Sequence, residues 1–65
     1  MPFVYIDLLP TDVERKKSLI EEITKAFVNV KYPAERVHIV IHEISSDNIG
    51  IGGEVYTNII KRRLK

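Results

Sequence analysis

The sequence has no cysteine and no tryptophan, and its 65 residues include only three glycines, three prolines and two histidines. Without cysteine the chain can form neither a disulfide nor a thiolate metal site, and two histidines do not supply the four ligands of a structural zinc ion. A chain this short buries only about 60% of the surface that its unfolded form exposes, so it usually needs a disulfide, a metal or a partner chain. We therefore expect one domain, residues 1–65, that gains stability by self-association.

Long hydrophobic runs and an excess of charge of one sign are also missing. Hydrophobic residues make up 45% and charged residues 29% of the chain, and the net charge is +1. This balance is typical of a globular protein and does not indicate a nucleic-acid partner. No apolar stretch approaches the roughly 20 residues that span a bilayer, and no basic leader precedes the first apolar residues. We expect a cytoplasmic protein with no membrane and no nucleic-acid partner.

Hydrophobic periodicity predicts a strand followed by a helix. Residues 3–9 are apolar with one interruption, which is typical of a strand covered on both faces. Residues 12–30 repeat their apolar positions with a period of 3.6 residues, which predicts a helix. Thr11 and Glu14 have the spacing of a capping box at its start.

A second strand and a turn-rich segment complete the chain. Residues 36–44 alternate between two faces and predict a strand, and a helix between two strands predicts that the strands are parallel. The fold class is therefore α/β (α+β), with a β-α-β unit of parallel strands. Residues 45–53 hold all three glycines and predict a turn, with backbone that has positive φ or that another chain approaches closely. Residues 54–64 fit a short helix, a strand that pairs with a neighbour, or both in sequence.

The two faces of the predicted sheet differ. The helix can cover only one face, and the all-aliphatic residues are the obvious choice, namely Val4, Ile6, Leu8, Val37, Ile39 and Ile41. The uncovered face keeps apolar residues, namely Phe3, Tyr5, Leu9, Val40 and Ile44. A two-stranded sheet is marginal by itself, and an exposed apolar face marks an association surface. We predict an obligate oligomer whose sheets face inward and whose helices face outward.

Most groups of residues that carry chemistry are missing. His38 and His42 share one face of a predicted strand but lie about 13 Å apart, so one chain cannot bring them to a single metal ion. The glycine segment lacks the lysine and hydroxyl of a phosphate loop, and a structural turn explains it better. The basic residues at the end of the chain indicate a solvated terminus or, as the less favoured alternative, phosphate contacts; they are Lys61, Arg62, Arg63 and Lys65.

Pro2 is the residue with the most unusual chemistry. Methionine before proline is normally removed, and removal would leave a free secondary amine at the start of the chain. An ordinary α-amino group has a pKa of about 7.7 to 8.0. Burial beside Phe3 or a partner's aromatic residues would penalise the charged amine and lower that value. Pro2 could then act as a general base, although Met-Pro is also a common start without function.

Over essentially its full length, the chain resembles the 4-oxalocrotonate tautomerase family. The resemblance rests on Pro2, on the β-α-β size, on the helix segment 16–20 (KKSLI) and on the turn segment 49–54 (IGIGGE). It implies a β-α-β subunit with a C-terminal glycine-rich hairpin, assembled as a homohexamer built from a trimer of dimers. It also implies that Pro2 moves a proton in an enol-keto acid such as a 2-hydroxydienoate, with no metal or organic cofactor.

The expected substrate-binding residues depart from the family pattern. The family's typical members carry an arginine in the loop after the first strand, where this chain has Leu-Pro-Thr-Asp at positions 9–12. His38 stands where a second arginine is usual, and Ile49 stands where an aromatic residue usually precedes the glycine turn. Guanidinium groups suit carboxylates because of their forked geometry. The resemblance therefore points to His38, Ile49 and Arg15 as substrate-binding residues, with Arg15 or Arg36 supplied by a neighbouring subunit.

Two other functions remain open from the sequence. A cationic proline can also protonate a substrate, so a hydratase or dehalogenase on the same fold is one alternative. A non-enzymatic oligomeric module that kept the fold and lost the site is the other, and the missing arginine pair motivates it.

Overall fold

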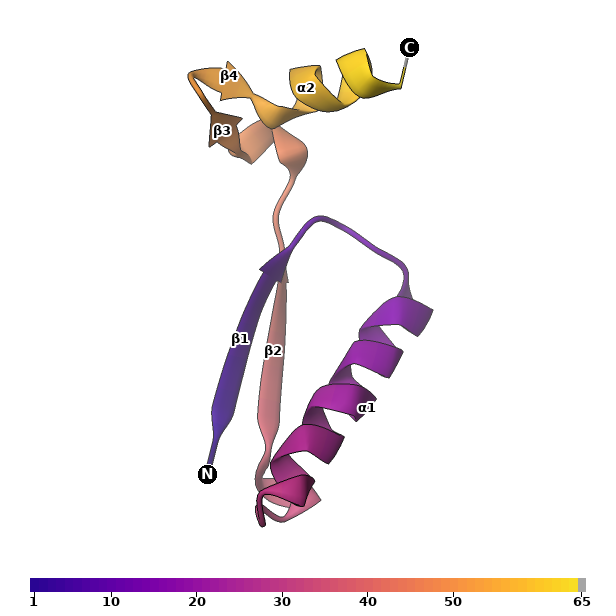
Figure 1. The fold of residues 1–65 in the computed structure, drawn as a ribbon, viewed down its shortest axis with the longest axis vertical. Helices are drawn as coiled ribbons and strands as arrows, with labels where there is room; N and C mark the ends of the chain where they lie inside the picture. The colour runs from indigo at the N-terminus through magenta and orange to yellow at the C-terminus, as the bar shows by residue number, and fades with distance from the viewer. Residues whose placement is uncertain (65) are drawn as a thin grey trace.

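A β-α-β unit forms the body of the chain in the computed structural model, which describes residues 1–64 (Figure 1). Strand β1 (Phe3–Leu8) is followed by helix α1 (Val13–Asn29), and strand β2 (His38–Glu43) returns beside β1. The strands are parallel, and their register runs from Phe3 opposite His38 to Leu8 opposite Glu43. The predicted strand-helix-strand order and parallel pairing are confirmed. The second strand is shorter than predicted, because Arg36 belongs to a short 3₁₀ turn, η1 (Ala34–Arg36).

The N-terminus of α1 differs from the predicted capping box. Asp12, not Thr11, is the N-cap, and its Oδ1 accepts a hydrogen bond from the Arg15 amide at 2.7 Å. A carboxylate at this position satisfies an unpaired amide of the first turn and interacts favourably with the helix dipole. Thr11 instead donates its own amide to Glu43 Oε2 at 2.9 Å. The prediction that Thr11 and Glu14 form the cap was therefore wrong by one residue.

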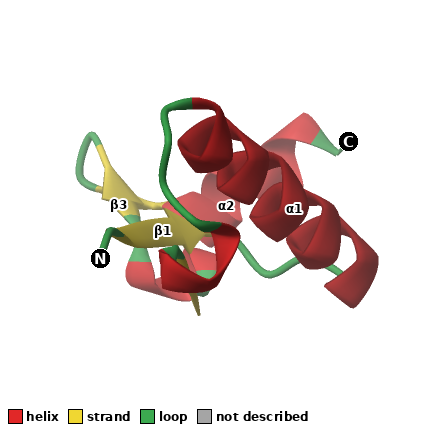
Figure 2. Cartoon of the chain, turned by 90° about the horizontal axis from the view of Figure 1, so that it is seen from below, coloured by secondary structure: helices red, strands yellow, loops and turns green. Residues whose placement is uncertain are grey.

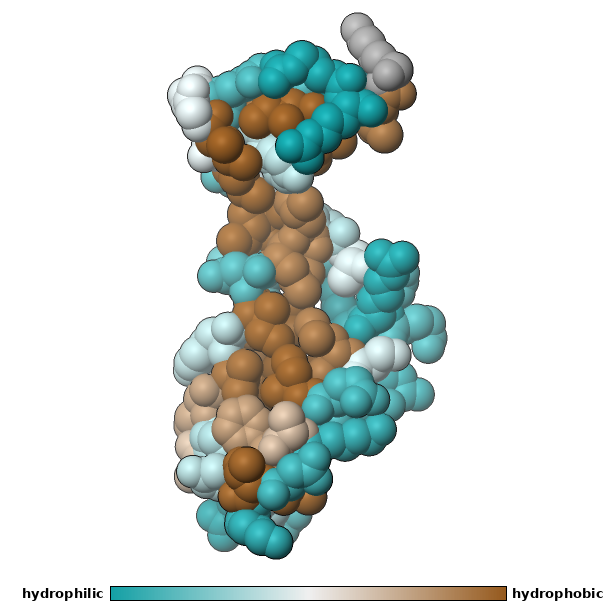
Figure 3. Space-filling view, in the orientation of Figure 1, coloured by the Kyte–Doolittle hydropathy of each residue, from teal (hydrophilic) through white to brown (hydrophobic). Residues whose placement is uncertain are grey.

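Helix α1 covers one face of the two strands and leaves the other bare. Val4, Ile6 and Leu8 are half-buried, whereas the alternating residues Phe3 and Tyr5 are 54% and 73% exposed. Seen from below, α1 lies to one side of the strands (Figure 2). Hydrophobic residues form a continuous band over the strands and up the connecting segment (Figure 3).

No residue among positions 1–64 is fully buried in the single chain. The half-buried and exposed apolar residues therefore form a core that is open on one side. This is the arrangement expected for a subunit whose bare face is covered by another copy.

The last part of the chain forms an arm that projects from the body (Figure 1). After the 3₁₀ turn η2 (Ser46–Asn48), strands β3 (Gly50–Ile51) and β4 (Glu54–Val55) pair antiparallel and helix α2 (Tyr56–Arg63) follows. Of the three alternatives for residues 54–64, the structure has a strand and then a helix in sequence. The predicted glycine turn is confirmed, because Gly52 and Gly53 have φ values of +59° and +83°, which only glycine adopts without strain.

Polar contacts within the arm fix its shape. Ser46 Oγ and Thr57 Oγ1 lie 2.6 Å apart, which ties the start of α2 to η2. Arg62 Nη2 donates to Glu54 Oε1 at 2.8 Å, so part of the basic tail is paired within the arm. This ion pair lowers the pKa of Glu54 and raises that of Arg62, first through the hydrogen bond and then through the opposite charges. Lys65, the last residue of that predicted tail, lies outside the described residues.

The arm makes the chain elongated. The chain measures 45 × 22 × 15 Å and its radius of gyration is 15.7 Å, against about 11 Å for a compact chain of this length. Neither helix in the described part of the chain has the length and apolar character that a membrane crossing requires.

Candidate functional site

Pro2 lies at the amino end of the parallel strand pair. It directly precedes β1 and is half-buried. Its carbonyl accepts a hydrogen bond from the His38 amide at 3.0 Å, so the first residue of β2 holds the main chain of Pro2 in place. This bond uses the Pro2 carbonyl and leaves the ring nitrogen, the atom with potential chemistry, on the N-terminal side.

His38 is the predicted binding residue that the structure brings closest to Pro2 along the sheet. Its ring stacks on Phe3 with a centroid distance of 4.9 Å and an interplanar angle of 19°. Phe3 in turn stacks on Tyr5 at 6.4 Å. These three rings form a row on the bare face, beginning one residue after Pro2. The stacking restricts the orientation of His38, and its half-buried ring is available as a hydrogen-bond donor to a ligand beside Pro2.

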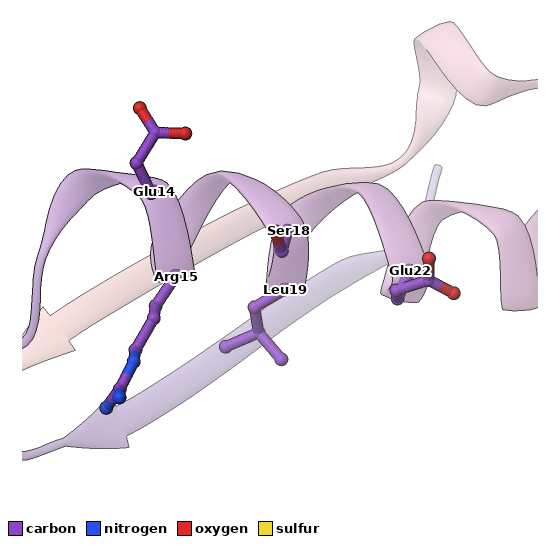
Figure 4. Close-up of a pocket in the computed structure, with 5 residues that line it drawn as sticks. All are labelled: Glu14, Arg15, Ser18, Leu19 and Glu22. Atoms are coloured by element: carbon purple, nitrogen blue, oxygen red, sulfur yellow. The ribbon is translucent and has the colours of Figure 1, made fainter.

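Arg15 lies at the opposite end of the strands. It belongs to the first turn of α1, which begins where β1 ends, so about 20 Å of strand separates it from Pro2 within one chain. Its side chain is 82% exposed, and its Nε lies 3.7 Å from Asp12 Oδ2. Figure 4 shows Arg15 and Leu19 projecting from the same side of α1, while Glu14 points away. An open depression of about 390 Å³ extends along this part of α1 and is lined by Glu14, Arg15, Ser18, Leu19 and Glu22.

A second, more apolar groove lies where β1 ends and α1 begins. Its volume is about 320 Å³. Three leucines and three polar residues line it, namely Leu8, Leu9, Thr11, Arg15, Lys16 and Leu19. The groove combines aliphatic walls with cationic side chains, which is the composition that binds a small organic anion.

Glu43 does not line the groove but contacts two residues that do, Lys16 and Thr11. Its Oε1 lies 2.9 Å from Lys16 Nζ and its Oε2 accepts the Thr11 amide at 2.9 Å. These bonds lower the pKa of Glu43, first through Lys16 and then through the Thr11 amide. Glu43 therefore stays ionised, ties the last residue of β2 to the loop after β1, and offsets the charge of Lys16.

Ile49 lies in the arm, away from both ends of the strand pair. It follows η2, is half-buried, and its carbonyl accepts the Tyr56 amide at 2.7 Å. A single chain therefore brings His38 together with Pro2 but not Arg15 or Ile49. His42, the other histidine of β2, pairs with Asp7 of β1 through Nδ1 and Oδ1 at 3.1 Å. Among residues 1–64, no three His, Cys, Asp or Glu side chains gather in a way that could hold a metal ion.

Comparisons with known proteins agree with this architecture. A family model described as tautomerase enzyme matches residues 2–59. A solved 4-oxalocrotonate tautomerase isozyme from Methylibium petroleiphilum has a TM-score of 0.79 at 33% identity, over 89% of this chain and 97% of that one. The chain belongs to the 4-oxalocrotonate tautomerase family.

Curated members of this tautomerase family are similar over most of their length. A probable tautomerase of Listeria monocytogenes serotype 4b is 39% identical over 56 residues, which cover 82% of this chain and 90% of the relative. The 2-hydroxymuconate tautomerase of Comamonas testosteroni is 40% identical over 55 residues, which cover 82% and 87%. The resemblance inferred from the sequence is thus confirmed at the level of family and fold.

Sequence reasoning missed part of the candidate site. The apolar groove and the role of Glu43 depend on contacts between residues up to 32 positions apart. The one signal available was the register: once the strands are taken as parallel, Glu43 falls opposite Leu8, beside the loop that carries Thr11.

Proposed function

We propose that this chain is a keto-enol tautomerase whose general base is the nitrogen of Pro2, exposed by removal of Met1. The observation that supports this most strongly is the position of Pro2 in a member of the tautomerase family. It is half-buried at the amino end of the strand pair, its carbonyl is held by the His38 amide, and it directly precedes Phe3, whose ring stacks on that of His38. A secondary amine there is rigid, and covering of the bare face by another copy favours its neutral form by removing water.

The proposed reaction is a proton transfer that needs no metal or organic cofactor. The neutral Pro2 amine takes the hydroxyl proton of an enol acid, so the O–H bond breaks and a carbonyl forms. The same proton is then delivered to a carbon of the conjugated system, which forms the new C–H bond and returns the amine to its neutral state. His38 donates a hydrogen bond to the oxygen on which charge develops.

We propose a homohexamer, a trimer of dimers, as the working form, with the site shared between copies. Within the described residues β1 pairs only with β2, so its outer edge keeps unpaired main-chain groups. If two β1 edges pair antiparallel about a twofold axis, with Phe3 of one copy opposite Leu8 of the other, Pro2 falls opposite Leu9. Leu9 lines the groove that contains Arg15. This pairing would bring Arg15 of a neighbouring copy toward Pro2, and the arm that carries Ile49 would contact another copy.

The proposed function is tested by processing and substitution together. Intact-mass measurement of the purified protein should show loss of one methionine. Ketonisation of phenylenolpyruvate, followed by its ultraviolet absorbance, should fall by about 100-fold or more in Pro2→Ala, because general acid-base catalysis contributes about 10²- to 10⁴-fold. Pro33→Ala, a proline substitution in the turn before β2, is the matched control and should keep the rate.

Two outcomes would separate the alternatives. Equal activity in Pro2→Ala would overturn the proposal that Pro2 is the base. Full retention of Met1 in cells would overturn it in favour of a non-enzymatic oligomeric module. Turnover of a haloacrylate with no ketonisation would instead identify a hydratase or dehalogenase.

A further inference from the structure

We infer that the groove at the end of β1 selects substrates with one carboxylate and an apolar body, and that Arg15 holds the carboxylate. This inference rests on the proposed function and names its substrate class. The groove, of about 320 Å³, is large enough for a small organic acid, and Leu8, Leu9 and Leu19 provide its apolar walls. A phenyl or alkyl group fits those walls, whereas a second carboxylate would lose its hydration against them.

The cations of the groove are not equivalent. Lys16 is already bound by Glu43, whose other oxygen is bound by the Thr11 amide. Both oxygens of Glu43 are thus occupied, and the carboxylate is fixed next to the ammonium group that it neutralises. A substrate carboxylate placed at Lys16 would have to displace this pair or lie against the charge of Glu43.

Arg15 is different because its forked end is open. Asp12 lies beside Nε, at 3.7 Å, and its other oxygen is used to cap α1. Among residues 1–64, the two terminal nitrogens of Arg15 make no hydrogen bond to a side chain or carbonyl. One guanidinium fork binds one carboxylate bidentately. The groove therefore offers a full binding site for a single carboxylate and no equivalent site for a second.

The specificity is tested first on the unaltered protein. The value of kcat/KM for phenylenolpyruvate, a monoacid with an aromatic body, is compared with that for 2-hydroxymuconate, a diacid. We expect the monoacid to be favoured by at least about tenfold, since an unpaired carboxylate against apolar walls costs more than 1.4 kcal/mol. A preference for the diacid would overturn the inference and leave the proposed function intact. Turnover of either acid that does not depend on Pro2 would overturn the proposed function itself.

Substitutions then assign the residues. Arg15→Gln should raise KM for the monoacid about 10- to 100-fold with a smaller change in kcat, because a carboxylate held equally in substrate and transition state affects binding. Arg63→Gln removes an arginine from the exposed end of α2 and is the matched control. An unchanged KM for the monoacid in Arg15→Gln would show that Arg15 does not hold the carboxylate. A rise in this KM in Arg36→Gln but not in Arg15→Gln would show the same.

Glu43→Gln provides a test in the opposite direction. Glutamine keeps an oxygen for the Thr11 amide but removes the charge that neutralises Lys16, so a second carboxylate gains a cation. The ratio of kcat/KM for diacid to monoacid should rise by about two- to fivefold, the effect of one exposed charge pair gained. A ratio that does not change would contradict the role assigned to Glu43, and circular dichroism checks that the variant is folded.

Discussion

The two faces of the β1–β2 pair are built from different residues and have different roles: one packs under α1, and the other is exposed. The face under α1 presents aliphatic side chains, such as Val4, Ile6 and Ile41, which are half-buried within one chain. The opposite face presents the Phe3, Tyr5 and His38 rings and ends in the Asp7–His42 pair. The covered face forms from contacts within one chain, whereas we expect the bare face to be completed by another chain.

This difference explains why a chain with a correct β-α-β unit still has no buried core. Covering one face of a two-stranded sheet buries each side chain only in part. We therefore expect the folding of the chain and its association through the bare face to be coupled. Substitutions on the two faces should separate the contribution of the helix from that of the neighbouring copies.

The largest effect is expected from a charge on the bare face. Val40→Asp places a carboxylate among exposed apolar side chains that association would cover, and an unpaired buried charge is strongly destabilising. We expect sedimentation velocity to show loss of the oligomer and circular dichroism to show loss of structure. Val13→Asp makes the same change at the exposed start of α1 and should keep the oligomer. If Val40→Asp keeps the oligomer mass of the unaltered protein, the assignment of the bare face as the interface is contradicted.

A smaller effect is expected on the covered face. Ile41→Ala shortens a half-buried aliphatic side chain of β2 on the face under α1, and such truncations cost about 2 kcal/mol or more when the side chain lies in a core. The loss should appear in urea unfolding as a lower midpoint, while the oligomer mass stays the same. Ile20→Ala, on the exposed side of α1, should change stability by less than about 0.5 kcal/mol. Dissociation of Ile41→Ala before unfolding would show that the covered face also contributes to the interface.

The start of the covering helix should respond to loss of its cap. Asp12→Ala removes the acceptor of the Arg15 amide and should cost about 1 kcal/mol. Thr11→Ala is a matched control because Thr11 uses its main-chain amide, which alanine keeps. Thermal unfolding followed by circular dichroism compares the two variants. A larger loss in Thr11→Ala would restore the capping box predicted from the sequence.

The sequence predicted the elements that depend on local pattern and missed those that depend on distant contacts. The period of α1 and the alternation of β1 placed the aliphatic and aromatic faces correctly. The helix cap was wrong by one residue, because Thr11 and Asp12 are both good caps and the choice depends on Glu43, 32 residues from Thr11. The strand-then-helix order of residues 54–64 stayed open, because β4 has only two residues and the contact between Ser46 and Thr57 fixes where α2 begins.

The candidate site was predictable only in part for the same reason. Pro2 stood out by its chemistry, and the register of parallel strands places His38 beside it. Arg15 and Ile49 lie at the far end of β1 and in the arm, so no property of a single chain decides whether they meet Pro2. Their roles depend on how copies assemble, and a sequence pattern carries that information only through a family resemblance.

The smallest effect is expected at low pH, which should weaken the contact between α1 and the β1–β2 pair. The pKa of Glu43 is lowered by Lys16 and then by the Thr11 amide. Its bonds therefore stabilise the fold at pH values above the ordinary carboxyl pKa of about 4.3 and are lost as the pH falls through the lowered value. Hydrogen-exchange protection of the Thr11 amide should drop between pH 6 and pH 3, and Glu43→Gln should remove that dependence. Glu54→Gln breaks the corresponding pair with Arg62 in the arm. This variant should keep the pH dependence of Thr11 protection. Constant protection of Thr11 across this range would mean that Glu43 does not join the covered face to its helix.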